Sequence, residues 1–154
     1  MKTGSQPNAF SLMELVVVMI IIGVVAAVAV PRFSSASTRQ RAQAAARRIE
    51  ADLNRLQRYA YQTSTSQGAV FDTTTHAYAM AGMPDPDKPG KYYIVSLADE
   101  PYQATIAEAN FSGQPKFEYD GYGIPSVGGK VTIDVGGIKY SIIVDPETGR
   151  AYLE

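Results

Sequence analysis

The chain has 154 residues, of which 45% are hydrophobic and 19% are charged, and its formal net charge is −1. This length suits one modest globular domain once an apolar segment near the N-terminus is set aside. Cysteine is absent, which excludes a disulfide-stapled scaffold and thiol catalysis. Charge is distributed unevenly, because residues 32–58 are rich in arginine and the acidic residues dominate after residue 70.

A polar leader, residues 1–9, precedes an apolar segment that we place at residues 10–31. From Phe10 to Val30, this segment makes about 31 Å of helix, which is enough to cross a bilayer. Glu14 is its only acidic residue. A carboxylate in hydrocarbon costs roughly 2.5 to 3.5 kcal/mol, so it is rarely left there without a partner. The sequence therefore predicts a positive partner for Glu14.

The run Ala9-Phe10-Ser11-Leu12-Met13-Glu14-Leu15 resembles the signal of type IV prepilins and of the pseudopilins of type II secretion. The resemblance implies that a prepilin peptidase cuts after Ala9 and N-methylates Phe10. It also implies that Glu14 is the carboxylate that recruits subunits into a fibre. The family usually has Gly before the cut, where this chain has Ala9.

The same resemblance implies partners and a location. The partners are other pilin or pseudopilin subunits, the prepilin peptidase and an inner-membrane platform, with no cofactor. The location is the bacterial inner membrane, crossed once, with the C-terminal domain in the periplasm or outside.

Three alternatives compete for the apolar segment. The small residues of Ala27-Val28-Ala29 would suit an ordinary secretory signal cut after Ala29, which would release a soluble protein. A plain membrane anchor and a buried core helix are the other two. The positive-inside rule also opposes export of the domain, because Arg32 and Arg39 follow the segment and only Lys2 precedes it.

Helical periodicity continues beyond the apolar segment. We expect Pro31 to kink or loosen the helix, and the family resemblance adds Gly23 as a second kink position. Residues 32–62 then read as an amphipathic helix with one apolar stripe, made by Ala42, Ala45, Ala46, Ile49, Leu53, Leu56 and Ala60. The other faces carry Arg39, Arg41, Arg47, Arg48, Arg55 and Arg58.

Residues 63–154 have strand periodicity. The clearest hairpin joins residues 131–135 to 138–144 through Gly136-Gly137. Further strands are expected at 70–72, 76–80, 91–97, 116–119 and 151–153, and residues 105–111 suit either a strand or a helical turn. The predicted fold class is α+β, a long N-terminal helix packed on a small antiparallel β-sheet. The C-terminal third resembles the H-type minor pseudopilins and the FimT-like minor pilins.

Catalysis finds little support in the residues. His76 is the only imidazole, and no nucleophile elbow, phosphate loop or zinc spacing occurs. We therefore expect that the protein is not an enzyme, and that His76 lies on a strand surface. Asp85 and Asp87 offer too few oxygens to define a calcium site. The tyrosines at 92, 93, 119 and 122 are expected to pack the sheet.

The predicted function is that of a structural subunit, a minor pseudopilin or pilin, in a type II secretion pseudopilus or a type IV pilus. The alternative is a minor pilin that binds DNA or a secretion substrate, which the arginines support because they could contact phosphates.

Overall fold

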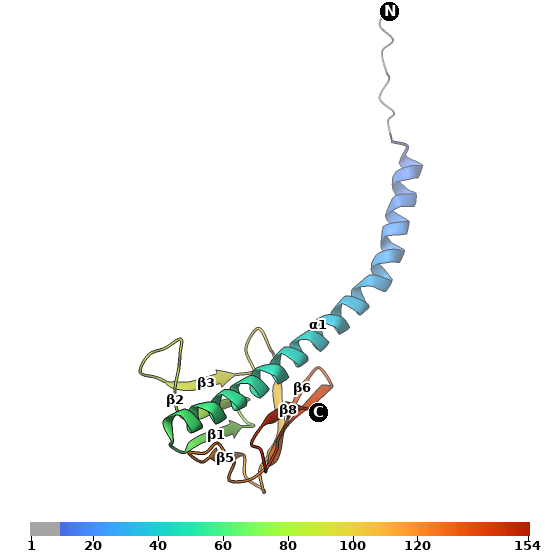
Figure 1. Cartoon of the computed structure of the whole chain (residues 1–154). Helices are drawn as coiled ribbons and strands as arrows, with labels where there is room; N and C mark the ends of the chain where they lie inside the picture. The colour runs from blue at the N-terminus through green and yellow to red at the C-terminus, as the bar shows by residue number, and fades with distance from the viewer. Residues whose placement is uncertain (1–9) are drawn as a thin grey trace, which may run out of the picture. The chain divides into compact units, whose positions relative to one another are not determined.

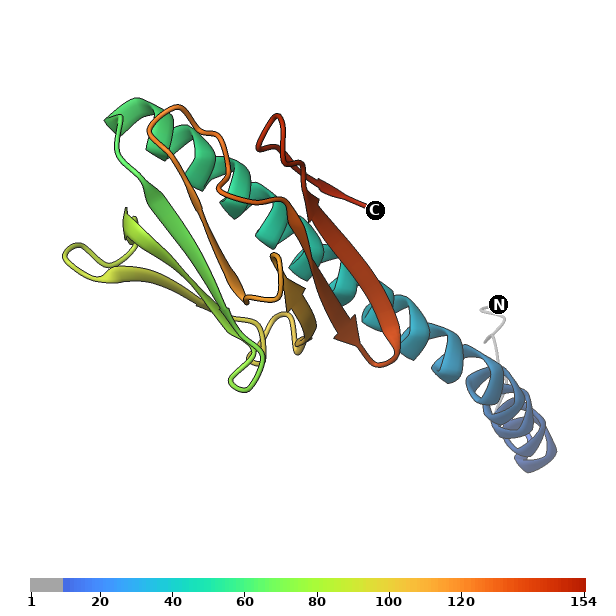
Figure 2. The same ribbon diagram turned by 90° about the horizontal axis from the view of Figure 1, so that it is seen from below.

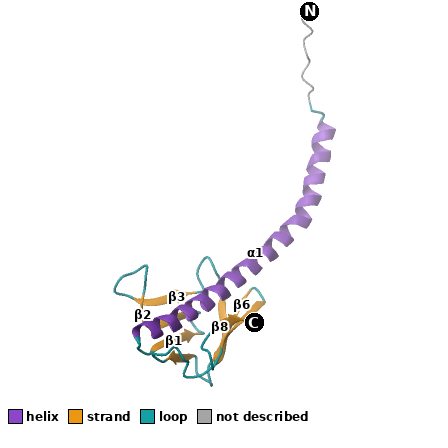
Figure 3. Ribbon diagram, in the orientation of Figure 1, coloured by secondary structure: helices purple, strands orange, loops and turns teal. Residues whose placement is uncertain are grey.

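A computed structural model of the chain describes residues 10–154, apart from the side chains of residues 28–34. The chain divides after Ser37 into two compact units. The described part contains one helix, α1 (Leu12–Thr63), followed by eight strands (Figures 1 and 3). The predicted order of elements is therefore confirmed, and the ambiguous stretch at 105–111 is a strand.

The C-terminal end of α1 is closed by its own backbone. Ser64 has a positive φ of 51°, and the N–H groups of Ser64 and Thr65 bond the carbonyls of Tyr61 and Ala60. A left-handed residue with these two bonds is the motif that satisfies the last carbonyls of a helix. The chain can therefore turn directly into the first strand.

The first sheet has the order β3-β2-β1-β5, with all neighbours antiparallel. Its strands are β1 (Gln67–Asp72), β2 (Ala77–Pro84), β3 (Tyr92–Ser96) and β5 (Lys116–Tyr119). The β1–β2 turn is held by Asp72, whose carboxylate accepts the N–H groups of Thr74 and Thr75. The expected strands at 70–72 and 76–80 therefore form a hairpin.

The second sheet has the order β4-β6-β7-β8, again antiparallel. Its strands are β4 (Thr105–Asn110), β6 (Gly129–Val135), β7 (Ile138–Val144) and β8 (Ala151–Leu153). Gly136 and Gly137 join β6 to β7 with φ values of 57° and 88°. Two consecutive positive φ angles define the turn that matches strand twist, and glycine adopts them without steric cost.

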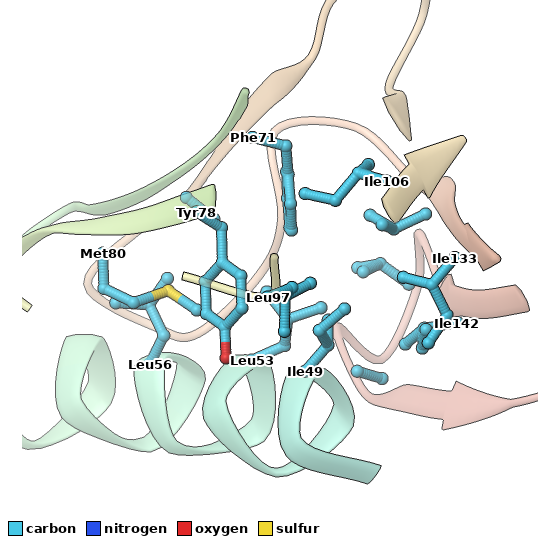
Figure 4. Close-up of a cluster of buried hydrophobic side chains, with 14 of the residues drawn as sticks. Ile49, Leu53, Leu56, Phe71, Tyr78, Met80, Leu97, Ile106, Ile133 and Ile142 are labelled. Atoms are coloured by element: carbon cyan, nitrogen blue, oxygen red, sulfur yellow. The ribbon is translucent and has the colours of Figure 1, made fainter. Parts of the chain in front are cut away.

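The core lies between α1 and the two sheets (Figure 4). All seven members of the predicted helix stripe, Ala42, Ala45, Ala46, Ile49, Leu53, Leu56 and Ala60, are fully buried. They meet residues from both sheets, among them Tyr78, Met80, Ile133 and Ile142. Each large apolar side chain buried in this way contributes about 1.5 to 3 kcal/mol.

An aromatic cluster joins the two sheets. Phe111, which directly follows β4, stacks on Phe117 of β5 with ring centroids 4.4 Å apart and on Phe71 of β1 at 5.8 Å. Phe117 also meets Tyr119 edge-on at 5.0 Å. The strands thus form two sheets that share one core, a division within the predicted class that the sequence pattern does not indicate.

Two expectations about single residues are wrong. His76 lies in the β1–β2 turn with a φ of 53°, and its Nδ1 accepts the N–H of Ile106 on β4 at 3.2 Å. It is therefore a bridge between the sheets and not a strand surface residue. Of the four tyrosines, Tyr93 and Tyr119 are buried, whereas Tyr92 and Tyr122 are 76% and 81% exposed.

Candidate assembly site at the start of the helix

The start of α1 is set by Ser11. Its carbonyl accepts the N–H of Leu15 at 3.1 Å, and its Oγ accepts the N–H of Met13 at 3.3 Å. Ser11 is therefore the N-cap residue, and Glu14 occupies the third helical position, where the positive end of the helix favours a carboxylate. This cap is not among the predicted features, although the pattern Ser-x-x-Glu at residues 11–14 is its signal in the sequence.

Glu14 is exposed, and the helical segment around it contains no other charge. In the range 10–27, whose side chains are described, it is the only charged residue, and no described residue forms an ion pair with it. From Phe10 to Val25 the large apolar side chains are between 41% and 81% exposed. A helix that is apolar on every side is suited to burial in an apolar surrounding.

A shallow apolar hollow of about 300 Å³ lies one helical turn beyond the cap. It is lined by Leu15, Val16, Met19 and Ile20. These residues follow Glu14 directly, so the carboxylate stands at the polar end of an otherwise hydrophobic surface. Such a surface can accept an apolar helix that also brings a positive charge to Glu14.

Several predicted site residues lie at the edge of the residues that the structure describes, or outside them. Ala9 and the leader lie outside the described residues, as do the side chains of Ala29 and Pro31. Backbone helix is continuous through Gly23 and Pro31, so a kink at either position stays a prediction. A methyl group added at Gly23 would meet no atom within 4 Å.

Within the residues that the structure describes, no helical stretch is both long enough and apolar enough to cross a bilayer. The segment predicted to span, residues 10–31, ends among the residues whose side chains lie outside the description.

A second charged site, which sequence reasoning missed, lies in the domain. Asp52 is 5% exposed, and its Oδ2 accepts bonds from the hydroxyls of Tyr78 at 2.6 Å and Tyr93 at 2.7 Å. The Nε of Arg48, one turn earlier on α1, lies 3.0 Å from the same oxygen. Arg48 also donates to the Tyr93 hydroxyl at 2.6 Å. The i,i+4 spacing of Arg48 and Asp52 was the only signal of this cluster in the sequence.

The cluster changes the acidity of its members. Burial, followed by the nearby Asp52 carboxylate, raises the pKa of Tyr78 far above its usual value. Burial and the hydrogen bond to Asp52 raise the pKa of Tyr93 to about 12. Partial burial lowers the pKa of Arg48, but Asp52 and Tyr93 together outweigh that effect and raise it. The phenols therefore stay protonated and the guanidinium charged, so the cluster joins α1 to β2 and β3.

The remaining arginines of α1 lie mostly on the exposed faces, as predicted. Arg39, Arg41, Arg47, Arg55 and Arg58 are exposed. The side chain of Arg41 donates to Gln103, and that of Arg55 lies 5.9 Å from the ring centre of Tyr93. Arg47 and Arg58 border a surface pocket with Glu50 and Asn54.

The described residues contain no group of three or more His, Asp or Glu side chains placed to hold a metal ion. Asp85 and Asp87 lie in the loop before β3, where Asp85 accepts the N–H of Asp87 at 2.9 Å. This local turn uses one carboxylate oxygen for the backbone.

Comparisons with known proteins place the N-terminal segment and the fold. The sequence model of the prokaryotic N-terminal methylation motif matches residues 5–30. The fold is similar to that of the type IV minor pilin FimU of Pseudomonas aeruginosa, with a TM-score of 0.57 and 15% identity, over 75% of this chain and 90% of that one. It is also similar to the minor pseudopilin EpsH of the Vibrio cholerae type 2 secretion system, with a TM-score of 0.55 and 15% identity, over 73% and 95% of the chains. Among curated proteins, no sequence match to this chain is found.

These findings confirm the resemblance that the first residues indicated. The chain combines a prepilin-type methylation motif with the α+β fold of minor pilins and pseudopilins.

Proposed function

We propose that this chain is a structural subunit of a type IV pilus or of a type II secretion pseudopilus, assembled through the first part of α1. The observation that carries the proposal is the isolated, exposed Glu14 at the head of an apolar helix. The methylation motif over residues 5–30 and the likeness to a minor pilin and a minor pseudopilin support it.

In this proposal, residues 10–31 hold the subunit in the bacterial inner membrane before assembly, and the domain stands on the periplasmic side. The prepilin peptidase cleaves after Ala9 and methylates the new amine on Phe10. The chain from residue 10 then begins with a positive charge, four residues before the carboxylate of Glu14.

Charge and hydrophobicity both favour docking in the fibre. A carboxylate and an ammonium group attract one another far more strongly at low dielectric than in water, and each is costly there without the other. The amine of a neighbouring subunit can neutralise Glu14. The apolar side chains around the helix then pack against the helices of other subunits.

The test is incorporation into fibres of a Glu14→Gln variant, which removes the charge and keeps the shape. We expect processing to be intact and the amount of the variant in sheared fibres to fall about tenfold or more. A tenfold change corresponds to only about 1.4 kcal/mol. The matched control is Glu147→Gln, the same substitution at an exposed position of the domain, which should enter fibres at the wild-type level. Glu14→Gln subunits present at the wild-type level would contradict the role of Glu14.

The mass of the N-terminal peptide from native membranes tests the processing step in the same samples. A methylated Phe10 terminus is expected. A chain that begins at Val30 would make the protein an ordinary secreted one, and an intact Met1 would leave a simple anchor.

A further inference from the structure

The two sheets have four edge strands, β3 and β5 in one and β4 and β8 in the other. The unpaired N–H and C=O groups of an edge strand are a template for another strand, so proteins usually cover them or guard them with charges. On three of these four edges, contacts within the domain bond outward backbone groups.

Asn54 of α1 covers β8, because its amide donates to the carbonyl of Ala151 at 2.9 Å and accepts the N–H of Ala151 at 3.1 Å. Ser126 covers β5 in the same manner. Its N–H bonds the carbonyl of Glu118 at 2.7 Å, and its hydroxyl accepts the N–H of Glu118 at 3.2 Å. On β4, the N–H of Ile106 is bonded by His76.

The fourth edge, β3, is open. The N–H of Leu97, just after β3, bonds His76 beside β2. Since the direction of backbone groups alternates along a strand, Val95 and Tyr93 also face β2, and Ile94 and Ser96 face away from it. In the part of the chain that the structure describes, no hydrogen bond reaches the outward backbone groups of Ile94 or Ser96. Figure 2 shows β3 at the outer edge of its sheet.

The side chains of β3 leave the edge unguarded as well. Its sequence, Tyr-Tyr-Ile-Val-Ser, contains no charged residue and no proline. Tyr92 is 76% exposed and Ile94 is 61% exposed. Ile94 also continues an apolar row across the outer face of the sheet, through its partner Ala79 to Val70.

We propose that β3 is an interaction edge that pairs antiparallel with β3 of a second copy of this chain. The pair is centred on Ile94, so that the N–H of each Ile94 donates to the carbonyl of the other. Tyr92 of each copy then lies opposite Ser96 of the other, and these two positions also present their backbone groups to the partner strand. The two sheets become one continuous sheet in which the exposed Ile94 side chains meet.

The charges that flank β3 favour antiparallel over parallel pairing of two copies. The loop before the strand contains Lys88 and Lys91 together with Asp85 and Asp87, and the loop after it contains Asp99 and Glu100. Antiparallel pairing sets the purely acidic loop of one copy beside the loop that holds both lysines of the other, twice. Parallel pairing would instead set the two acidic loops side by side, which is repulsive.

Such a contact uses the same surface on both copies and closes on itself, so it makes a dimer and cannot propagate. It goes beyond the proposed function, because contacts along a polar fibre join different surfaces. The dimer therefore belongs to the subunit outside the fibre, and it does not depend on Glu14.

The absence of cysteine makes the test direct, because one introduced thiol is the only thiol in the chain. The full-length Ile94→Cys variant is oxidised in membranes, with Val70→Cys as the matched control on the same face but in the middle of the sheet. Opposed residues of an antiparallel pair have Cα atoms about 5.5 Å apart, within disulfide range. We expect at least about tenfold more covalent dimer for Ile94→Cys than for Val70→Cys.

The register is tested by mixing full-length Tyr92→Cys and Ser96→Cys chains that carry different tags. The mixed disulfide should exceed both self-linked products. Intact mass identifies each product.

The proposal is overturned if the Ile94→Cys chain stays monomeric, cross-links as weakly as the Val70→Cys chain, or forms a disulfide with a different protein. If Ile94→Cys lowers the unfolding temperature, the mixed disulfide between Tyr92→Cys and Ser96→Cys chains tests the proposal instead, because both chains keep Ile94. A dimer that persists in the Glu14→Gln background separates this result from the fibre hypothesis.

Discussion

At the residue scale, Asp52 is a buried carboxylate of the described domain. One of its oxygens accepts three hydrogen bonds, from two strands and from its own helix. Removing one member of a buried charged cluster destabilises a protein strongly, because the remaining groups lose their partners. Replacing the whole cluster by apolar residues is far less destabilising. Asp52 thus determines how α1 is held against β2 and β3.

We expect Asp52→Ala to lower the free energy of unfolding by about 2 to 4 kcal/mol, because the buried Tyr78 hydroxyl is left without an acceptor and Arg48 without its ion pair. Denaturant unfolding of the two proteins measures the difference. The control is Asp99→Ala, at an exposed position, where the change should stay within about 0.5 kcal/mol. A loss below about 1 kcal/mol for Asp52→Ala would show that water replaces the lost contacts.

At the element scale, the short strand β8 depends on the helix. It has only three residues and pairs with β7 on one side. On its other side, Asn54 bonds both backbone groups of Ala151 and also the carbonyl of Glu50 within α1. An isolated three-residue edge strand is short enough to fray, so these bonds hold the C-terminus in place.

The variant Asn54→Leu should therefore loosen the last strand. We expect amide hydrogen exchange at residues 151–153 to become faster, with a stability loss of about 1 to 3 kcal/mol from the unsatisfied backbone groups. Hydrogen exchange followed by mass spectrometry of the C-terminal peptide measures the effect. Gln62→Leu, at an exposed site on the same helix, should leave that peptide unchanged. Unchanged protection in Asn54→Leu would instead mean that pairing with β7 is sufficient.

At the scale of the whole domain, residues 38–154, two sheets share a single core. Phe111 is 1% exposed and stacks on rings from β1 and β5, although it follows a strand of the other sheet. Because the same helix stripe and the same aromatic cluster contact both sheets, neither sheet has a separate core to retain when the other unfolds. We therefore expect one cooperative unfolding transition.

Phe111→Ala tests this coupling. It should lower the free energy of unfolding by about 3 to 5 kcal/mol, because a large cavity opens between the sheets. Hydrogen exchange should accelerate together in β1 and β6, which belong to different sheets. The control is Ile124→Ala, at a side chain that is 44% exposed. Protection that falls in one sheet alone would contradict a shared core.

The predictions that succeeded rest on local patterns. The stripe from Ala42 to Ala60 repeats every three or four residues, and that spacing alone places it on one face of a helix. Gly136-Gly137 between alternating residues predicts a hairpin for a similarly local reason. The prediction for His76 failed because the role of this residue depends on Ile106, thirty residues away. The buried state of Asp52 depends likewise on Tyr78 and Tyr93, which no helical spacing connects to it.

The sequence by itself therefore determined the order and type of the elements, the amphipathic half of α1, and the isolation of Glu14 in an apolar segment. Each of these follows from neighbours along the chain, where backbone periodicity and side-chain chemistry act directly. Only the tertiary structure decided that the strands form two sheets, that Asp52 joins the helix to one of them, and that β3 is the open edge. Those features depend on which distant backbone and side-chain groups satisfy one another, and packing of the whole domain makes that choice.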